Sequence, residues 1–367
     1  MNSNLPQMEP WFGPEEGEAL SRYMSTGGWL TEFKNTQAFE QALAEFCGAR
    51  HCIVVTSGTT ALMAAMMAMG VGPDDEVIVP NYTMIASPNS VLCTGAKPVF
   101  ADVERETLCL DIRLAEAAVT ERTRAIMLVN ANGREPSSGI KAFEDLANRH
   151  GVILMEDACQ ALGCWYRDGR HAGTATLVGT LSFSVPKIIT TGQGGALLTN
   201  DDDFAAKLRR VKDFGRARGG LDIHDTIGYN FKFTEMQAVV GLEQMKKLHH
   251  RLELKKHIYR RYADNLAAVE EVHMFGQDLS LTSPWFIDIC AKNRAGLIEH
   301  LRANGIGSRT MYPPINKQVA YQVPGEHPVS NWVGEEGLWL PSATQLSYGD
   351  IDRVTDCIKD YYAKLRH

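Results

Sequence analysis

Short apolar runs rich in β-branched residues recur along the first half of the chain, and each is followed by a turn and a segment with helical periodicity. The runs are CIVV (52–55), EVIVP (76–80), PVFADV (98–103), AIMLV (125–129), VILMED (152–157), TLSFS (180–184) and ALLT (196–199). Helical patterns such as GTTALMAAMMAMG and GIKAFEDLANRHG lie between them. Strands that alternate with helices are typical of a mainly parallel sheet covered on both faces, so the pattern predicts an α/β domain.

The strand signal fades in the second half of the chain. Residues 234–266 are predicted to form one long helix that leads to a smaller C-terminal domain. This domain contains a strand candidate, WFIDIC (285–290), and the helical patterns RAGLIEHLRANG and YGDIDRVTDCIKDYYAKL. We therefore predict a large domain at residues 1–245 and a smaller α+β domain at residues 246–367.

Composition and charge narrow the possible functions. Of 367 residues, 44% are hydrophobic and 22% charged, and the formal net charge of −7 provides no basic field for nucleic acid. The chain does not open with an export signal, and its longest apolar run, residues 61–72, is too short to cross a bilayer. Eight cysteines are scattered without a CxxC pair, which indicates reduced side chains and no metal site. We expect a soluble cytoplasmic protein that binds neither nucleic acid nor membrane.

Two polar motifs lie where predicted strands end, which is the edge that carries function in such folds. In VVTSGTTAL a strand leads through Ser57, Gly58 and Thr59 directly into a helix. Glycine and free helix amides favour an anion there, although a helix cap explains the serine equally well. Asp157 ends the next motif, VILMED, where a buried carboxylate needs a partner. It either caps a following helix or pairs with a protonated ring nitrogen.

Lys187 in TLSFSVPKIITTGQGG completes the set. Most lysines are solvated surface residues, and that interpretation would hold if Lys187 stood alone. Here it follows a predicted anion cradle and an acid. An amine for a Schiff base, an acid for a pyridinium nitrogen and a phosphate cradle are the parts that hold pyridoxal 5′-phosphate.

The ordered motifs carry a family resemblance. The series SGTTAL, EDACQALG, SFSVPKIITTGQGGALLTND, GYNFKFTEMQAVVGLEQMKKL and GLWLPSATQLSYGDIDRV resembles the DegT/DnrJ/EryC1/StrS aminotransferases, the sugar branch of the fold-type-I pyridoxal-phosphate enzymes. The similarity runs from about Pro10 to the C-terminus. It implies a PLP-dependent aminotransferase with a large cofactor-binding domain and a smaller C-terminal domain.

The resemblance also implies a role for each matching position. Lys187 would bind the cofactor and move protons, and Asp157 would pair with the ring nitrogen. Gln160 would lie near the ring hydroxyl, and Met84 would stand where the family usually stacks an aromatic side chain on the ring. The remaining cofactor positions are Ser57, Gly58, Thr59 and Ser182 at the phosphate. Substrate positions are Trp29, Lys232, Arg309, Tyr312 and Asn316, of which Lys232 and Asn316 replace a common arginine and histidine.

Asn230 is expected to act across a dimer interface. In the resembling family this asparagine reaches the phosphate in the neighbouring subunit, which implies a homodimer with shared active sites. The aromatic and apolar residues around it, Tyr229, Phe231, Phe233 and Met236, are typical of an interface but also of a subunit's own core.

The expected reaction moves the amino group of L-glutamate to a keto sugar. IGYN, KIITTGQGGALLTND and YPPIN look most like the branch that acts on nucleotide-linked 4-keto-6-deoxyhexoses, GDP-perosamine synthases included, in amino-sugar and lipopolysaccharide O-antigen biosynthesis. The family's sugar dehydratases carry histidine in place of Lys187, so the lysine indicates amino transfer. An inosose aminotransferase and a non-catalytic regulatory protein on the same fold are the alternatives.

Overall fold

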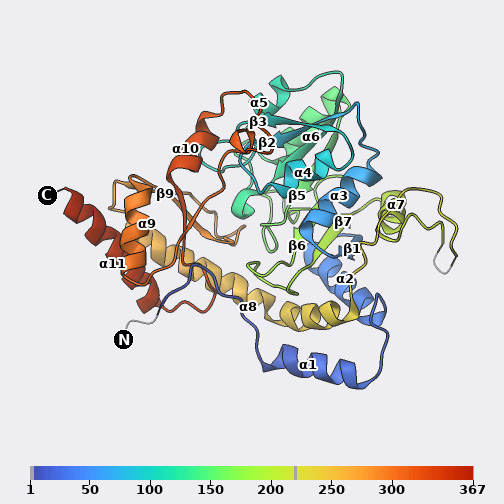
Figure 1. Ribbon diagram of the computed structural model, residues 1–367, viewed down its shortest axis with the longest axis horizontal. Helices are drawn as coiled ribbons and strands as arrows, with labels where there is room; N and C mark the ends of the chain where they lie inside the picture. The colour runs from blue at the N-terminus through green and yellow to red at the C-terminus, as the bar shows by residue number, and fades with distance from the viewer. Residues whose placement is uncertain (1–3, 219–220, 367) are drawn as a thin grey trace.

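The computed structural model describes residues 4–218 and 221–366. A seven-stranded sheet forms the centre of the larger part of the molecule (Figure 1). Its strand order is β1-β7-β6-β5-β4-β2-β3. Strands β2 to β6 are parallel to their neighbours in this group, whereas β7 is antiparallel to β1 and β6. The bounds are β1 (His51–Val55), β2 (Glu76–Pro80), β3 (Lys97–Ala101), β4 (Thr123–Val129), β5 (Ile153–Asp157), β6 (Gly179–Ser182) and β7 (Gly195–Thr199). The predicted mainly parallel sheet is therefore confirmed.

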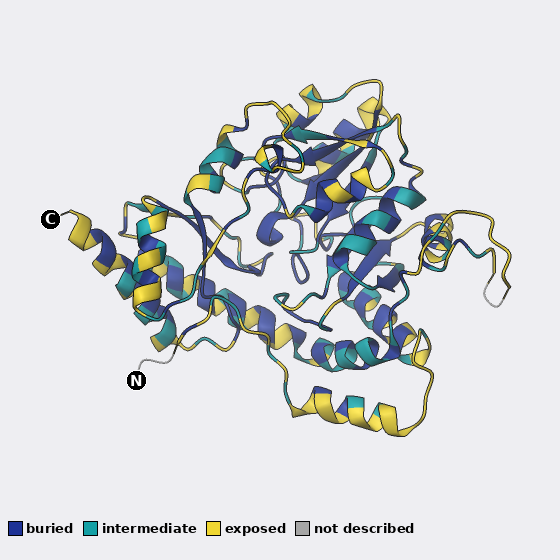
Figure 2. Ribbon diagram, in the orientation of Figure 1, coloured by how far each residue is buried: buried dark blue, intermediate teal, exposed yellow. Residues whose placement is uncertain are grey.

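Helices cover both faces of this sheet. Alternate residues of a strand point to opposite faces, so Ile126 and Leu128 contribute to one buried cluster and Ala125 and Met127 to the other. In Figure 2 the strands are accordingly dark, because side chains on both faces are buried. The covering helices are α2 (Lys34–Cys47), α3 (Gly58–Ala68), α4 (Ala86–Leu92), α5 (Ile112–Ala117), α6 (Ile140–His150) and α7 (Asp202–Lys212), with a 3-10 turn, η1, at Ala131–Gly133.

The second sheet is smaller and antiparallel, with order β10-β11-β9-β8. Its strands are β8 (Val272–Met274), β9 (Ile287–Ala291), β10 (Arg309–Thr310) and β11 (Gly337–Leu340). Its core also includes residues of α8 (Glu235–Leu266), α9 (Arg294–Ala303) and α11 (Tyr348–Leu365). The remaining elements of this part are η2 (Ile315–Lys317) and α10 (Pro328–Glu336). The predicted strand at 285–290 is thus displaced toward the C-terminus, and the other three strands were not predicted.

The long helix α8 contacts both parts of the molecule. It begins with a capping box in which Gln237 N donates to the Thr234 hydroxyl, and it packs against α2 near its start and α11 near its end. The predicted division at residue 245 lies inside this helix, and we retain it as a proposal. Leu5, at the other end of the chain, lies in the core of the second sheet, where its amide donates to Gly305 O at 2.9 Å.

Helix α1 (Pro14–Ser25) lies along the outer side of α8, with most of its surface exposed (Figures 1 and 2). Lys247 of α8 holds it through contacts of 2.6 and 2.8 Å with the buried carboxylate of Glu16. None of the described helices is both long and apolar enough to span a bilayer.

A buried ion pair joins the two sheets. Arg134, in the loop after β4, donates to both carboxylate oxygens of Asp288 in β9, at 2.9 and 2.7 Å. Asn132 adds a second connection, because its amide donates to Phe286 O and its oxygen accepts from Phe286 N. These bonds fix the start of β9 against the carboxyl end of β4, next to Asp157, which pairs with Val129 in the sheet.

Asp288→Ala should lower the free energy of unfolding by about 3–5 kcal/mol, because it leaves the buried Arg134 guanidinium without its counterion. Urea denaturation followed by circular dichroism measures the change. Asp352→Ala is the matched control: Asp352 makes the same two-pronged contact with Arg261, but at the surface, where ion pairs contribute little. Equal losses in the two variants would contradict a special role for the buried pair.

Candidate active site

Most of the predicted cofactor residues lie together at the carboxyl ends of β5 and β6 and at the adjacent start of α3, whereas Met84 and Asn230 are exposed. Gly195 of β7 pairs with Val55 of β1 on one side and with Ser182 of β6 on the other. A Cβ atom on Gly195 would lie 2.3 Å from Ser57 O, so a larger residue there would push the start of α3 away. The glycine therefore lets the two loops that carry Ser57 and Ser182 lie side by side.

The start of α3 combines a helix cap with a potential anion site. The Ser57 side chain accepts from Thr60 N at 3.1 Å, which makes Ser57 the N-cap. The amides of the first helical turn have no acceptor within a helix, so those of Gly58 and Thr59 are suited to an anion. A Cβ atom on Gly58 would lie only 2.9 Å from Ser182 Cβ and 3.0 Å from Cys159 Sγ. The space beside Gly58 is thus bounded by Ser182, as a phosphate cradle requires.

Asp157 is buried, with 5% of its surface exposed, and two protein donors satisfy its carboxylate. Ser87 Oγ donates to Oδ2 at 2.7 Å, and Cys159 N donates to Oδ1 at 3.2 Å. The Ser87 hydroxyl is held in turn by Thr83 at 2.8 Å. Residues 158–178 fold into turns without a helix, so the interpretation of Asp157 as a helix cap is wrong. These bonds orient the carboxylate but leave it without a cationic partner among the described residues.

The amine of Lys187 lies in a small cavity lined by Cys159, Gln160, Leu162, Ser182, Ile188 and Trp285. Burial lowers the pKa of Lys187 to about 8, because a charged ammonium is poorly solvated there; the Cys159 and Asp157 groups act in the opposite direction. The lysine is therefore near the balance between its neutral and protonated forms at neutral to slightly alkaline pH. This is the property that an imine-forming and proton-moving lysine needs.

Gln160 also lines the cavity, where its side-chain oxygen accepts from Asn132 N at 2.8 Å. Asn316 is placed differently: it is buried and hydrogen-bonded through its amide to Asn81 Nδ2 and Val323 O. Both polar ends of the Asn316 side chain are thus engaged within the protein, which gives it a structural function between the two sheets. Its predicted contact with substrate stays untested.

Met84 is half exposed just before α4, and its sulfur accepts from Ala86 N at 3.0 Å. Tyr82, two positions earlier, is buried, and its ring centroid lies 6.0 Å from that of Tyr312. Burial raises the pKa of Tyr312, and Asp157 acts in the same direction, which places this phenol near the site. The predicted stacking of Met84 on the cofactor remains a prediction.

Three other predicted substrate residues, Trp29, Arg309 and Lys232, and the predicted cofactor residue Asn230 lie at or near the surface. Trp29 is 65% exposed, with its indole nitrogen donating to the Thr31 hydroxyl. Arg309 is exposed, with its guanidinium 5.4 Å from the Trp339 ring centroid. Lys232 donates to Asp213 Oδ1 at 2.7 Å, and the neighbouring Asn230 is exposed. None of these four lines the cavity that contains the amine of Lys187.

Sequence reasoning missed Ser87 and Trp285, which contact Asp157 and Lys187 directly. Ser87 lies in the first turn of α4 and Thr83 in the loop before it, and no periodic pattern links their hydroxyls to Asp157. Trp285 had been noted only as the start of a strand candidate. Its position next to Phe286 in an apolar run was the available signal, but nothing local connects it to Lys187.

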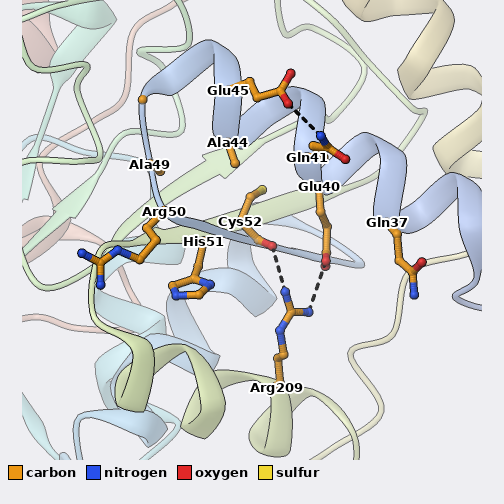
Figure 3. A pocket seen from close by; sticks show the side chains of 11 residues that line it. Gln37, Glu40, Gln41, Ala44, Glu45, Ala49, Arg50, His51, Cys52 and Arg209 are labelled. Carbon is orange, nitrogen blue, oxygen red and sulfur yellow. Dashed lines mark hydrogen bonds and ion pairs between the residues drawn. The ribbon is translucent and has the colours of Figure 1, made fainter.

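A separate groove beside α2 and β1 contains none of the predicted site residues (Figure 3). Arg209 reaches across it, donating to Glu40 Oε2 at 3.1 Å and to Cys52 O at 3.4 Å. Glu40 in turn accepts from Val54 N, so the buried carboxylate ties α2 to β1. Glu40 and Arg209, which line this groove, therefore serve to hold α2, β1 and α7 together.

Comparison with known proteins covers nearly the whole chain. The model of the DegT/DnrJ/EryC1/StrS aminotransferase family matches residues 13–359. The GDP-perosamine synthase of Caulobacter vibrioides is 37% identical over 350 residues, which cover 90% of this chain and 89% of that protein. The GDP-perosamine synthase of Vibrio cholerae is 32% identical, with 98% of this chain and 99% of that protein covered.

Among solved structures, S. venezuelae DesV in complex with a ketimine intermediate is similar with a TM-score of 0.89 and 32% identity. The match covers 95% of this chain and 94% of that chain. These comparisons confirm the fold class and the family resemblance that the sequence motifs had indicated.

Acetylation by trace acetic anhydride should distinguish Lys187 from an ordinary lysine, because the reagent attacks the neutral amine. Labelling of Lys187 should rise with pH around a midpoint of about 8. Lys141 is the internal control, since its hydrogen bond to Asp145 raises its pKa and its labelling should rise only at more alkaline pH. Digestion and mass spectrometry quantify both peptides. A common midpoint for the two would show that Lys187 is not desolvated.

Proposed function

Because the chain belongs to the DegT/DnrJ/EryC1/StrS aminotransferase family, we propose that it transfers the amino group of L-glutamate to a nucleotide-linked 4-keto-6-deoxyhexose. The chain is a pyridoxal-phosphate-dependent aminotransferase. The observation that carries the assignment of its centre is the desolvated amine of Lys187 in one cavity with Ser182 and Gln160, close to Asp157.

The residues of the site fit pyridoxal 5′-phosphate. Gly58 has no room for a Cβ atom beside Ser182, so the backbone there stays open to a ligand. The free amides of the first turn of α3 favour an anion at this place. Asp157 keeps a carboxylate that is oriented by Ser87 yet lacks a cation, which suits a protonated ring nitrogen. When bound, the cofactor supplies an electron sink for the bonds of the amino substrate. We assign Lys187 as its amine partner, Asp157 to the ring nitrogen, and Gly58, Thr59 and Ser182 to the phosphate.

Lys187 is proposed to move the proton that amino transfer requires. An effective general acid–base group has a pKa near the working pH, because it must both accept and return the proton. Burial brings Lys187 into this range, since it lowers the pKa of the amine to about 8. Ser87 and Cys159 N hold Asp157 from the protein side, so the carboxylate stays fixed while the lysine exchanges its proton at Nζ.

The proposed sugar class rests on the similarity to two relatives, both GDP-perosamine synthases. They favour a GDP-linked sugar over the inosose and non-catalytic alternatives. We further propose that the product serves surface glycan synthesis, including lipopolysaccharide O-antigen, and that the enzyme acts in the cytoplasm, where activated sugars are made.

Incubation with nitrogen-labelled glutamate and a GDP-linked 4-keto-6-deoxyhexose should yield an amino sugar that carries the label. Mass spectrometry of the nucleotide sugar measures the product, and dTDP-linked and UDP-linked sugars and an inosose serve as competitors. Lys187→Ala, with the same cradle, should give no product. Borohydride should fix the cofactor to Lys187 in the wild-type protein. Labelled inosose without labelled sugar would overturn the proposed substrate, and fixation on another lysine would overturn the proposed site.

We also propose a homodimer with shared active sites. Phe231 and Phe233 are buried in the subunit's own core, whereas Tyr229 is 52% exposed and Asn230 is exposed beside it. Ile223 and Ile227, a few residues earlier in the same loop, are also exposed, at 62% and 73%. A contiguous exposed apolar patch is typical of an interaction surface. A second copy covering it would place Asn230 at the partner's phosphate, as the family resemblance implies.

Mixed dimers test this arrangement. Lys187→Ala subunits are inactive and Asn230→Ala subunits are expected to bind the cofactor weakly. In a mixed dimer, one site contains Lys187 from one subunit and a donated Asn230 from the other, so activity should exceed the sum of the parent proteins. Native mass spectrometry verifies subunit exchange. Complete exchange without a gain in activity would show that Asn230 is not donated to the partner.

A further inference from the structure

The indole of Trp285 lies against the amine of Lys187. Lys187 Nζ is 3.6 Å from the centroid of the indole ring, and both side chains line the same cavity. Trp285 lies just before β9 of the smaller sheet, whereas Lys187 follows β6 of the larger one. With 4% of its surface exposed, the indole offers the amine a ring face that water does not cover.

Three contacts hold the indole in this position. Its Nε1 donates to Pro186 O at 2.7 Å, the carbonyl that immediately precedes Lys187. The backbone carbonyl of Trp285 accepts from Lys255 Nζ at 2.8 Å. Its ring is stacked on Phe286, with centroids 3.9 Å apart, and Phe286 N donates to Asn132. These contacts fix the orientation of the indole ring relative to Lys187.

The ring face favours the protonated form of the amine. The negative face of an indole attracts an ammonium, more strongly where water is excluded. Asp157, the last residue of β5, and Cys159, in the loop after it, are the other titratable groups that act on Lys187. From α8, Arg251 donates to Ile188 O and Lys255 to Trp285 O, so both cations face backbone carbonyls near the amine. Trp285 is the group that covers Nζ itself.

We propose that the face of Trp285 is the resting site of the Lys187 ammonium whenever the amine is not covalently bound, which makes Trp285 a positioning residue for the proton that the lysine carries. When the amine is not covalently bound, the flexible four-carbon side chain of Lys187 would otherwise let the ammonium group take many positions. The indole gives the ammonium one defined position inside the cavity. The catalytic meaning of this site rests on the proposed function, whereas the contact itself does not.

Fluorinated tryptophans test the contact without changing the shape of the ring. Fluorine weakens the negative ring face, so the labelling midpoint of Lys187 should fall stepwise from mono- to trifluorotryptophan, by up to about one pH unit. The full chain, freed of cofactor, is produced with each analogue and acetylated as described above. Trp285→Phe made with the same analogues is the matched control. It retains the other five tryptophans, including Trp332, whose ring lies 3.7 Å from the Arg105 guanidinium.

A stepwise fall in wild type and a constant midpoint in Trp285→Phe support the proposal. A constant or rising midpoint in wild type overturns it, since water entry and lost packing are excluded by the preserved ring shape. For turnover, the pH profile of the single-turnover reaction with glutamate should shift in the same direction by the same amount. An unchanged profile would overturn the function of the resting site in catalysis. If borohydride fixed the cofactor to another lysine, the proposed function would fail while the fluorine effect on Lys187 remained.

Discussion

Removal of one amine from water is the constraint on which the rest of the structure depends. A lysine in water has a pKa of about 10.4 and is protonated at neutral pH, so it lacks the lone pair that imine formation needs. Residues from both sheets shield Lys187 from water: Cys159 and Ser182 belong to the part with the larger sheet, and Trp285 belongs to the part with the smaller one. Neither sheet alone encloses the amine. The two parts of the chain must therefore meet with a fixed geometry before the lysine acquires its chemistry.

Buried polar bonds fix that geometry. Apolar packing at the junction would tolerate small rotations, whereas hydrogen bonds between buried groups are lost when the groups shift. Arg134 with Asp288 and Asn132 with Phe286 hold β9 beside the carboxyl end of β4. Lys255 of α8 adds a bond to Trp285 O and one to Ser342 O. Burying these polar groups costs desolvation free energy. In return, the junction fixes the position of the indole over Lys187.

Local pattern in the sequence was sufficient for the larger sheet, and it singled out two residues of the candidate site. Most strands of that sheet are buried on both faces and read as short apolar runs; Asp157 ends one of them, β5, and Lys187 lies in the loop that follows another, β6. Strands β8, β10 and β11 have three, two and four residues, too few for an alternating pattern to stand out. The bond between Trp285 and Pro186 joins residues 99 positions apart, and no periodicity reports such a contact. Turns follow Asp157 where a helix was one of the two alternatives, and the Glu156 carboxylate accepts from the amides of Gly173 and Ala175 in this segment.

The path of the chain through its two cores bears on how the protein is made. Leu248 and Leu252, in the middle of α8, belong to the core of the larger sheet, so that core stays incomplete on the ribosome until well over half of the chain has been synthesised. Leu5 is the opposite case: it is synthesised long before Ile306, with which it pairs in the second core. The N-terminal segment therefore waits through most of translation for the residues that bury it. During this interval its apolar side chains depend on chaperones or on the nascent large domain for cover.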